Sequence, residues 1–291
     1  FCDLAKKHNA NTNIIKGDNL LKQNFPMIHA VGRASDQEPR LLDMQWGENN
    51  NPKVTLVGKG VCFDTGGLNI KPTASMSLMK KDMGGSATVL GLAHMIMSLN
   101  LKINLRVIIP AVENSISSNS FRPQDILISR KGMSVEINHT DAEGRLILAD
   151  ALSLADEDKP DLLICNATLT GAARVALGPD MPPYFTDDDQ LANQIQNASI
   201  ENVDPLWRMP FWSPYESFIE PEVADLDNAP KGGFAGAITA ALFLRRFVEK
   251  AKYFVHFDLF AWAPVAKPSQ SQGGACQSAR AMLSVIEKRY E

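Results

Sequence analysis

Seven charged residues have the types and spacing that could assemble a hydrolytic centre. The segment DAEGR, residues 141–145, holds two carboxylates and an arginine within five positions. If this segment is extended, its alternate side chains point the same way, so Asp141, Glu143 and Arg145 are predicted to converge on one spot. Carboxylates offer the hard oxygen ligands that divalent cations prefer. The other four charged residues lie upstream and are Lys59, Asp64, Lys71 and Asp82.

Four carboxylates in one pocket would repel one another, and burying them without cations would cost several kcal/mol per charge. Two divalent cations would resolve this conflict. Bridging carboxylates hold two metal ions about 3.5 to 4 Å apart, and the pKa of a shared water then falls from about 15.7 towards about 7. Nearby lysine and arginine side chains would stabilise the negative charge that hydroxide attack builds on a carbonyl. The residues therefore predict a two-metal hydrolase.

The lysines have two possible roles on these grounds alone. A lysine that binds metal must be neutral, and lowering its pKa from about 10.4 to below 7 costs roughly 5 kcal/mol. A lysine that stabilises an oxyanion stays charged. The glycine-rich segment 57–72 could instead cradle phosphate, but it lacks the spacing of a P-loop. Hydrolysis of phosphate esters remains open, because clustered Asp, Lys and Arg side chains also serve that chemistry.

Composition limits the classes of partner. The chain has 291 residues, 45% of them hydrophobic, a formal net charge of -4 and a pI near 5.8. It therefore has no global basic field, and neither nucleic acid nor a membrane is an expected partner. No apolar run is long enough to span a bilayer. The four cysteines lie far apart without CxxC spacing, which predicts reduced, buried thiols and a cytoplasmic location.

Apolar runs alternate with amphipathic stretches, which is typical of a layered α/β fold. We predict a mixed, largely parallel central β-sheet flanked by helices on both faces, in a single catalytic domain. The charged residues follow predicted strand ends, where open α/β sheets bind ligands. The Pro-rich stretch 181–184 predicts a loop. Predicted strands are 53–58, 103–110, 134–138, 161–167 and 253–259, and predicted helices are 85–99, 146–156, 190–202, 236–250 and 275–291.

Three segments, VGKGVCFDTGGLNIKP, MKKDMGGSA and TDAEGRLILADAL, occur in an order and spacing that resemble the leucyl aminopeptidase family of dimetal exopeptidases. The resemblance extends to ATLTGAARVALG and to GGFAGAITAALFLRRFV, so it covers the chain broadly. It implies an enzyme that releases leucine-like N-terminal residues, over a broad range, from peptide substrates. It also implies two divalent metal ions, zinc or manganese or both, and a homohexamer.

The family pattern assigns a role to each matching residue. It implies that Asp64 and Glu143 bridge the metals, that Asp141 completes one metal shell, and that Lys59 and Asp82 complete the other. Lys71 would polarise the scissile carbonyl, and Arg145 would hold a bicarbonate ion that serves as general base. The matching substrate-binding positions, which would form an apolar pocket for the first side chain, are Met79, Thr168 and Gly171.

Further expectations follow from the same resemblance. Family members carry an additional N-terminal domain, so residues 1–30 are interpreted as a linker or leading helix that follows it, and 31–291 as the catalytic domain. His139 stands where the family usually has asparagine; we expect a loop residue there rather than a metal ligand. His256 is expected to be a hydrogen-bonded core histidine. The alternative function is a non-catalytic hexameric scaffold or a DNA-binding family member, against which the intact charged set argues.

Overall fold

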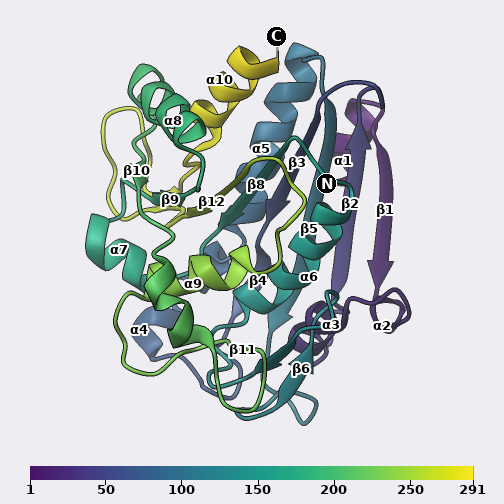
Figure 1. The fold of residues 1–291 in the computed structure, drawn as a ribbon, viewed down its shortest axis with the longest axis vertical. Coiled ribbons are helices and arrows are strands. Elements are labelled where there is room, and N and C mark those ends of the chain that lie inside the picture. The colour runs from purple at the N-terminus through teal and green to yellow at the C-terminus, as the bar shows by residue number, and fades with distance from the viewer. Residues whose placement is uncertain (291) are drawn as a thin grey trace.

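The central layer of the protein is a nine-stranded mixed sheet, seen in a computed structural model that describes residues 1–290 (Figure 1). Five strand pairs are parallel and three are antiparallel, which confirms the predicted mixed, largely parallel sheet. In spatial order the strands are β1 (Asn11–Lys16), β2 (Arg40–Trp46), β5 (Asn104–Asn114), β3 (Lys53–Gly58), β8 (Leu162–Ala167), β12 (Phe254–Asp258), β9 (Pro183–Phe185) and β10 (Trp207–Arg208), while β4 (Gly60–Asp64) pairs with β5.

Helices cover both faces of this sheet (Figure 1). Helices α5, α8 and α10 pack together on one face, and α3, α6 and α9 pack on the other. Helix α5 ends at Leu99 and is capped by Asn100, whose left-handed φ of 53° is typical of a helix C-terminus. The α-helices are α1 (Cys2–Lys7), α2 (Asn19–Lys22), α3 (Pro26–Gly32), α4 (Thr73–Met76), α5 (Gly84–Leu99), α6 (Gly144–Glu157), α7 (Gly171–Leu177), α8 (Asp189–Glu201), α9 (Gly236–Arg245) and α10 (Ala279–Tyr290).

Alternating side chains of the central strands feed two separate cores. In β3, Leu56 points into the core under α5, whereas its neighbour Val57 points into the core under α6. Ile164 and Cys165 in β8 divide in the same way. Successive residues of a strand face opposite sides of the sheet. Where helices cover both faces of the sheet, the strand must therefore be apolar on both sides. This explains why these strands were predictable.

The remaining elements are short. Two 3-10 helices, a three-stranded sheet and a two-stranded sheet complete the described part of the chain. These elements are η1 (Met79–Lys81), η2 (Ser213–Ile219), β6 (Ile126–Ile128), β7 (Ser134–Glu136), β11 (Leu226–Asp227), β13 (Trp262–Ala263) and β14 (Gly273–Gly274).

The predicted elements are present, with corrected ends. The predicted helix 236–250 ends at Arg245, because Phe247 and Val248 donate to carbonyls three residues back in a tighter turn. The last helix begins at Ala279 rather than 275, and Glu291 at its predicted end lies outside the described residues. The loop prediction for 181–184 was wrong at its end, where β9 begins. Pro183 is the first residue of that strand, a position that needs no proline N–H.

Strands β1 and β2 were not predicted, although β1 pairs along its length with β2 at one end of the sheet. The burial pattern of β1 is mostly exposed, so its sequence lacks an apolar signal. The division into 1–30 and 31–291 stays a prediction. Within residues 1–290, no helix combines the length and apolar character needed to cross a bilayer.

Two core predictions need correction. All four cysteines are free, but only Cys165 is buried, while Cys2, Cys62 and Cys276 are exposed. Cys62 is exposed because β4 lies off the main strand path and pairs only with β5. His256 is fully buried as expected, yet neither ring nitrogen has a hydrogen-bond partner within residues 1–290. Burial lowers the pKa of His256 to about 3, so its ring is neutral.

Asp150 on α6 provides a test of how the helices are tied together. Its buried carboxylate accepts hydrogen bonds from the backbone N–H groups of Met27 (2.8 Å), Ile28 (3.3 Å) and Arg130 (2.8 Å). Asp150→Ala would leave these donors unpaired, and we expect the free energy of unfolding in urea to fall by about 3 kcal/mol. The exposed Asp36→Ala is the control. A loss below about 0.5 kcal/mol for Asp150→Ala would contradict this role.

Candidate functional site

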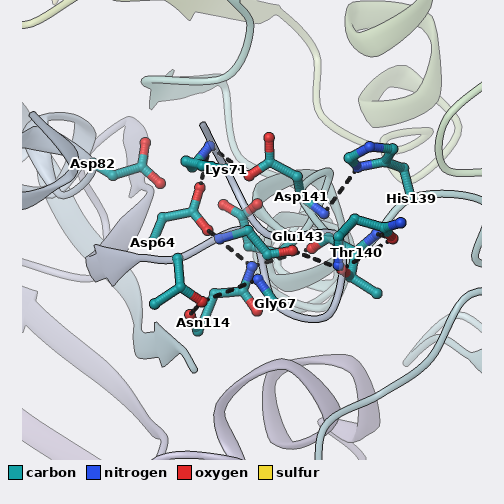
Figure 2. Close-up of polar contacts among 12 residues, drawn as sticks. Asp64, Gly67, Lys71, Asp82, Asn114, His139, Thr140, Asp141 and Glu143 are labelled. Atoms are coloured by element: carbon teal, nitrogen blue, oxygen red, sulfur yellow. Dashed lines mark hydrogen bonds and ion pairs between the residues drawn. The ribbon is translucent and has the colours of Figure 1, made fainter. Parts of the chain in front are cut away.

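Charged side chains from three distant segments meet at one edge of the sheet (Figure 2). Lys59 joins β3 to β4, Asp64 ends β4, and Asp82 lies just before α5. Asp141 and Glu143 lie just before α6. Carboxylate oxygens of Asp64, Asp141 and Glu143 lie within 4.8 Å of one another. The fold therefore brings the predicted carboxylates and lysines into a single cluster.

Lys59 occupies one half of the cluster and is almost fully buried. Its Nζ lies 2.7 Å from Asp82 Oδ2 and 2.9 Å from Glu143 Oε1, and it donates to the Thr168 carbonyl at 3.0 Å. Burial by itself would lower the pKa of Lys59, but the negative charges of Asp82, Glu143 and Asp64 raise it above its usual range. Thr168 Oγ1 also donates to Asp82 Oδ1 at 2.7 Å. Thr168 thus holds both members of this ion pair.

Lys71 occupies the other half, between Asp64 and Asp141 (Figure 2). Its Nζ lies 2.8 Å from Asp64 Oδ2 and 2.5 Å from Asp141 Oδ1. Asp64 Oδ1 accepts hydrogen bonds from Gly66 N and Asn114 Nδ2, both at 2.9 Å. Burial would raise the pKa of Asp64, but the charges of Lys59 and Lys71 hold it below its usual value. Asp64 is therefore an anion fixed from several sides.

The remaining two carboxyl groups resist ionisation. Burial raises the pKa of Glu143 well above its usual value, and the charge of Asp64 adds to the effect. The pKa of Asp141 is raised by the same two causes in the same order. If all four carboxyl groups were ionised, their negative charge would exceed the positive charge of the two lysines.

Glycine permits the close approach of α5 and α6 to the cluster. A Cβ at Gly85 would lie 2.1 Å from the carbonyl oxygen of Asn166, and one at Gly144 would lie 2.5 Å from Lys59 Cε. Real Cβ atoms do not approach so closely, so any larger residue would displace a strand end or Lys59. In the loop after β4, Gly66 (φ +90°) and Gly67 (φ +65°) adopt the left-handed conformations that favour glycine.

The predicted extended geometry of 141–145 was wrong, although two of its three side chains do converge. Asp141 lies in a turn, and Glu143 has helical angles of φ -76° and ψ -34° at the start of α6. Because α6 begins at Gly144, the side chains of 141–145 do not alternate as they would in a strand. Arg145 therefore does not share one face with Asp141 and Glu143.

Arg145 lies beside the cluster but does not line its cavity. The guanidinium is buried against the Phe243 ring, at 5.8 Å from the ring centre. Burial lowers the pKa of Arg145 to about 10. Its Nε and Nη1 have no hydrogen-bond partner among residues 1–290. Two unpaired buried donors on a cation form a suitable place for an anion.

A cavity of about 460 Å³ opens onto the cluster. The predicted substrate-binding residues Met79, Thr168 and Gly171 all lie in its wall, and so do Lys71 and Asp141. Lys81 also lines the cavity, and burial lowers its pKa to about 8. The cavity thus joins an apolar wall to the charged centre.

His139 does not join the cluster. Its side chain is exposed, and Nδ1 accepts a hydrogen bond from the backbone N–H of Asp141 at 3.2 Å (Figure 2). It is absent from the group of side chains able to share an ion. This agrees with its interpretation as a loop residue.

Several residues that hold the site were not predicted. Asn228 Oδ1 accepts from the backbone N–H of Asn138 at 2.8 Å, and its Nδ2 donates to the His139 carbonyl at 2.8 Å. Asp258 Oδ1 accepts from Leu169 N and Thr170 N, both at 3.0 Å. Each of these contacts joins residues about 90 positions apart, so the sequence does not reveal them. Only Asp258 could have been proposed as a site residue, because it lies at the end of a strand.

The donor set fits divalent cations. Asp64, Asp82, Asp141 and Glu143 against two lysines leave a formal surplus of two negative charges. Buried oxygens Asp82 Oδ2, Asp141 Oδ1 and Glu143 Oε1 lie within ion-pair distance of a lysine but make no hydrogen bond of good geometry within residues 1–290. Divalent cations bind oxygen ligands that carry negative charge and are not already occupied by hydrogen-bond donors.

The fold and site together define the class of α/β proteins that carry a buried, cation-accepting carboxylate cluster beyond the strand ends of the central sheet. Residues 2–283 match the description "Cytosol aminopeptidase family, catalytic domain". The chain belongs to the cytosol aminopeptidase family. This confirms the resemblance inferred from the three sequence segments.

Similar proteins support the assignment. The cytosol aminopeptidase of Encephalitozoon cuniculi is 43% identical over 258 residues, which cover 88% of this chain and 53% of that protein. Peptidase B of Pectobacterium atrosepticum is 41% identical over 267 residues, covering 90% of this chain and 61% of that protein. The chain therefore spans about half to three fifths of the length of these relatives.

Solved structures agree with the fold. The crystal structure of the cytosol aminopeptidase from Coxiella burnetii has a TM-score of 0.97 and 50% identity, with 100% of this chain and 63% of that chain covered. The bottromycin maturation enzyme BotP in complex with Mn has a TM-score of 0.94 and 32% identity, with coverage of 100% and 65%.

Gly144 tests the packing of α6 against Lys59. Gly144→Ala would place a Cβ 2.5 Å from Lys59 Cε and 2.8 Å from its Nζ, so we expect a loss of roughly 2 kcal/mol in the free energy of unfolding from overpacking. The control is Gly171→Ala, because nothing lies within 4 Å of a Cβ there. Equal stability of the two variants in a urea titration would show that the contact is not restrictive.

Proposed function

We propose that the protein is a metal-dependent aminopeptidase that releases N-terminal residues from peptides. The observation that carries this proposal is the buried cluster with surplus negative charge, which opens on a cavity in a chain of the cytosol aminopeptidase family. The names of the relatives, cytosol aminopeptidase and peptidase B, support the same reaction.

Two divalent cations would be held by the clustered side chains. Asp64, Asp82, Asp141 and Glu143 would supply oxygen donors to the ions, and Lys59 would supply a nitrogen donor once it loses its proton. Oxygen donors with one lysine suit manganese or zinc, and manganese is the ion in the BotP complex. Bound there, the ions would supply a hydroxide near neutral pH for attack on the peptide carbonyl.

Lys71 would stabilise the carbonyl oxygen as negative charge develops on it. Its Nζ lies in the cavity wall between Asp64 and Asp141, which raise its pKa above the usual range against the effect of burial. The amine is therefore a permanent cation, and a fixed donor at this place lowers the barrier for attack. Thr168 would keep Lys59 and Asp82 in place from behind.

Arg145 would hold a bicarbonate ion that accepts protons as general base. The support for this role is its buried guanidinium with two unpaired nitrogens beside Glu143. Met79, Thr168 and Gly171 would form the wall that receives the first side chain, and leucine-like residues would fit its apolar part. Assembly as a homohexamer and a cytoplasmic location remain proposals that rest on the family.

Metal removal is the first test. Dialysis against a strong chelator is expected to abolish hydrolysis of leucine aminomethylcoumarin, because the reactive hydroxide needs the ions. Manganese, zinc or cobalt should restore activity, and metal analysis should find two ions per chain. Full activity in chelator would refute the mechanism.

Lys71→Gln is the second test. Loss of the cation is expected to lower kcat by about 10²- to 10³-fold, since one donor to the developing charge is removed. The two metal ions should remain bound, because Lys71 is not a proposed ligand. Lys102→Gln, at an exposed position, is the control and should behave as the parent protein. Loss of metal from Lys71→Gln would contradict its assigned role.

A further inference from the structure

Three donors from one loop meet the carboxylate of Asp258 at the end of β12. Asp258 Oδ1 accepts hydrogen bonds from Leu169 N and Thr170 N, both at 3.0 Å, and Oδ2 accepts from Thr170 Oγ1 at 2.6 Å. The side chain is almost fully buried. Burial raises the pKa of Asp258 to about 6, against the effect of these hydrogen bonds, so the group is an anion at neutral pH. Hydrogen bonds to an anion are stronger than those to a neutral acceptor, so the loop is held firmly.

Asp258 reaches this loop because β12 lies beside β8. The two strands are parallel, and Asp258 lies opposite Ala167, the last residue of β8. The loop is therefore the chain that leaves β8, residues 168–170, before α7 begins. Thr170 is the N-cap of α7, since its Oγ1 accepts from Ala173 N at 3.1 Å. Asp258 is thus not needed as a helix cap, and its hydrogen bonds serve the loop itself.

One peptide group connects Asp258 to the charged cluster. The N–H of this group belongs to Leu169 and donates to Asp258. Its carbonyl belongs to Thr168 and accepts from Lys59 Nζ at 3.0 Å. A peptide group is planar and rigid, so whatever fixes the direction of its N–H also fixes the direction of its C=O. Asp258 holds the end away from the cluster and thereby directs the carbonyl oxygen at Lys59.

The direction of this carbonyl matters for the Lys59 amine, which has three acceptors. They are Asp82 at 2.7 Å, Glu143 at 2.9 Å and the Thr168 carbonyl at 3.0 Å. An amine that gives up a proton to bind a cation keeps two N–H groups and one lone pair. The acceptors of the N–H groups then decide where the lone pair points. Because the two carboxylates are themselves proposed to bind cations, the Thr168 carbonyl is the acceptor left to orient the amine.

We propose that Asp258 is a positioning residue, which orients the Lys59 amine for cation binding through the peptide group between Thr168 and Leu169. It would touch neither the cation nor the substrate. This inference rests on the proposed function and deepens it, since it concerns how the same site retains its ions. Removal of an outer partner of this kind typically weakens metal binding by about 10- to 100-fold.

The test is a calorimetric titration of the metal-free protein with manganese, which needs no substrate. Asp258→Ala is expected to weaken manganese binding by about 10- to 100-fold, because the peptide group loses its anchor. Asp258→Asn keeps one acceptor oxygen for the backbone N–H groups, so its loss should be smaller. Thr170→Val removes only the hydroxyl contact and should also bind manganese more weakly than the parent protein, which keeps the test available if Asp258→Ala does not fold.

Asp150 provides a matched control. Its carboxylate is also buried and accepts three backbone N–H groups, but none of the residues that donate them lines the cavity. Asp150→Asn should lower the melting temperature as Asp258→Asn does, while its manganese affinity stays at the parent value. Equal weakening of manganese binding in both variants would overturn the proposal, because Asp258 would then act only through stability.

Turnover of leucine aminomethylcoumarin separates the remaining outcomes. Saturating manganese should return kcat of Asp258→Asn towards the parent value with KM unchanged, since the defect lies in cation binding. A KM that stays raised at saturating manganese would overturn the proposal, because Asp258 would then act on the cavity wall at Gly171. Unchanged manganese affinity in Asp258→Ala would also overturn it, and an active parent protein would leave the proposed function intact. Weakened affinity in that variant, beside a parent that hydrolyses no amide, would support the proposal and refute the proposed function alone.

Discussion

Burial of like charges is the constraint on which the rest of the structure depends. Four carboxylates lie together at the sheet edge, and two lysines among them neutralise only half of their formal charge. Buried carboxylates are tolerated only when cations and donors surround them. Backbone N–H groups, Asn114 and Thr168 supply donors here, and the remaining negative charge creates the affinity for divalent cations. The unneutralised negative charge that destabilises the metal-free site would thus also allow it to bind the ions.

The fold meets this constraint by bringing backbone segments unusually close. Gly85 and Gly144 allow α5 and α6 to begin directly against Lys59 and the end of β8. Both helices are anchored by apolar faces on opposite sides of the sheet, so their N-terminal ends are fixed where the charges meet. Asp64 ends a strand and Glu143 begins a helix, so the packing of core elements positions two of the four carboxylates.

Much of this architecture was predictable because strong local signals agreed with the tertiary fold. The doubly covered strands β3 and β8 have continuous apolar runs, and helices α5 and α6 are long segments rich in apolar residues. The prediction failed for strands that form only because a neighbouring strand pairs with them. Strand β1 is largely exposed and exists because β2 lies beside it, and β9 begins with a proline that sequence reasoning interpreted as a loop.

The sequence by itself determined the chemical types at the site and, through three motifs, the family, because glycines and charged residues at these spacings are seldom interchangeable. Tertiary structure decided how they are used. Asp141 and Glu143 converge through a turn and a helix start rather than through an extended segment, and Arg145 lies apart from the cavity. The pairing of Lys59 with Glu143 and of Lys71 with Asp141 depends on contacts between segments far apart in the chain, which no local pattern encodes.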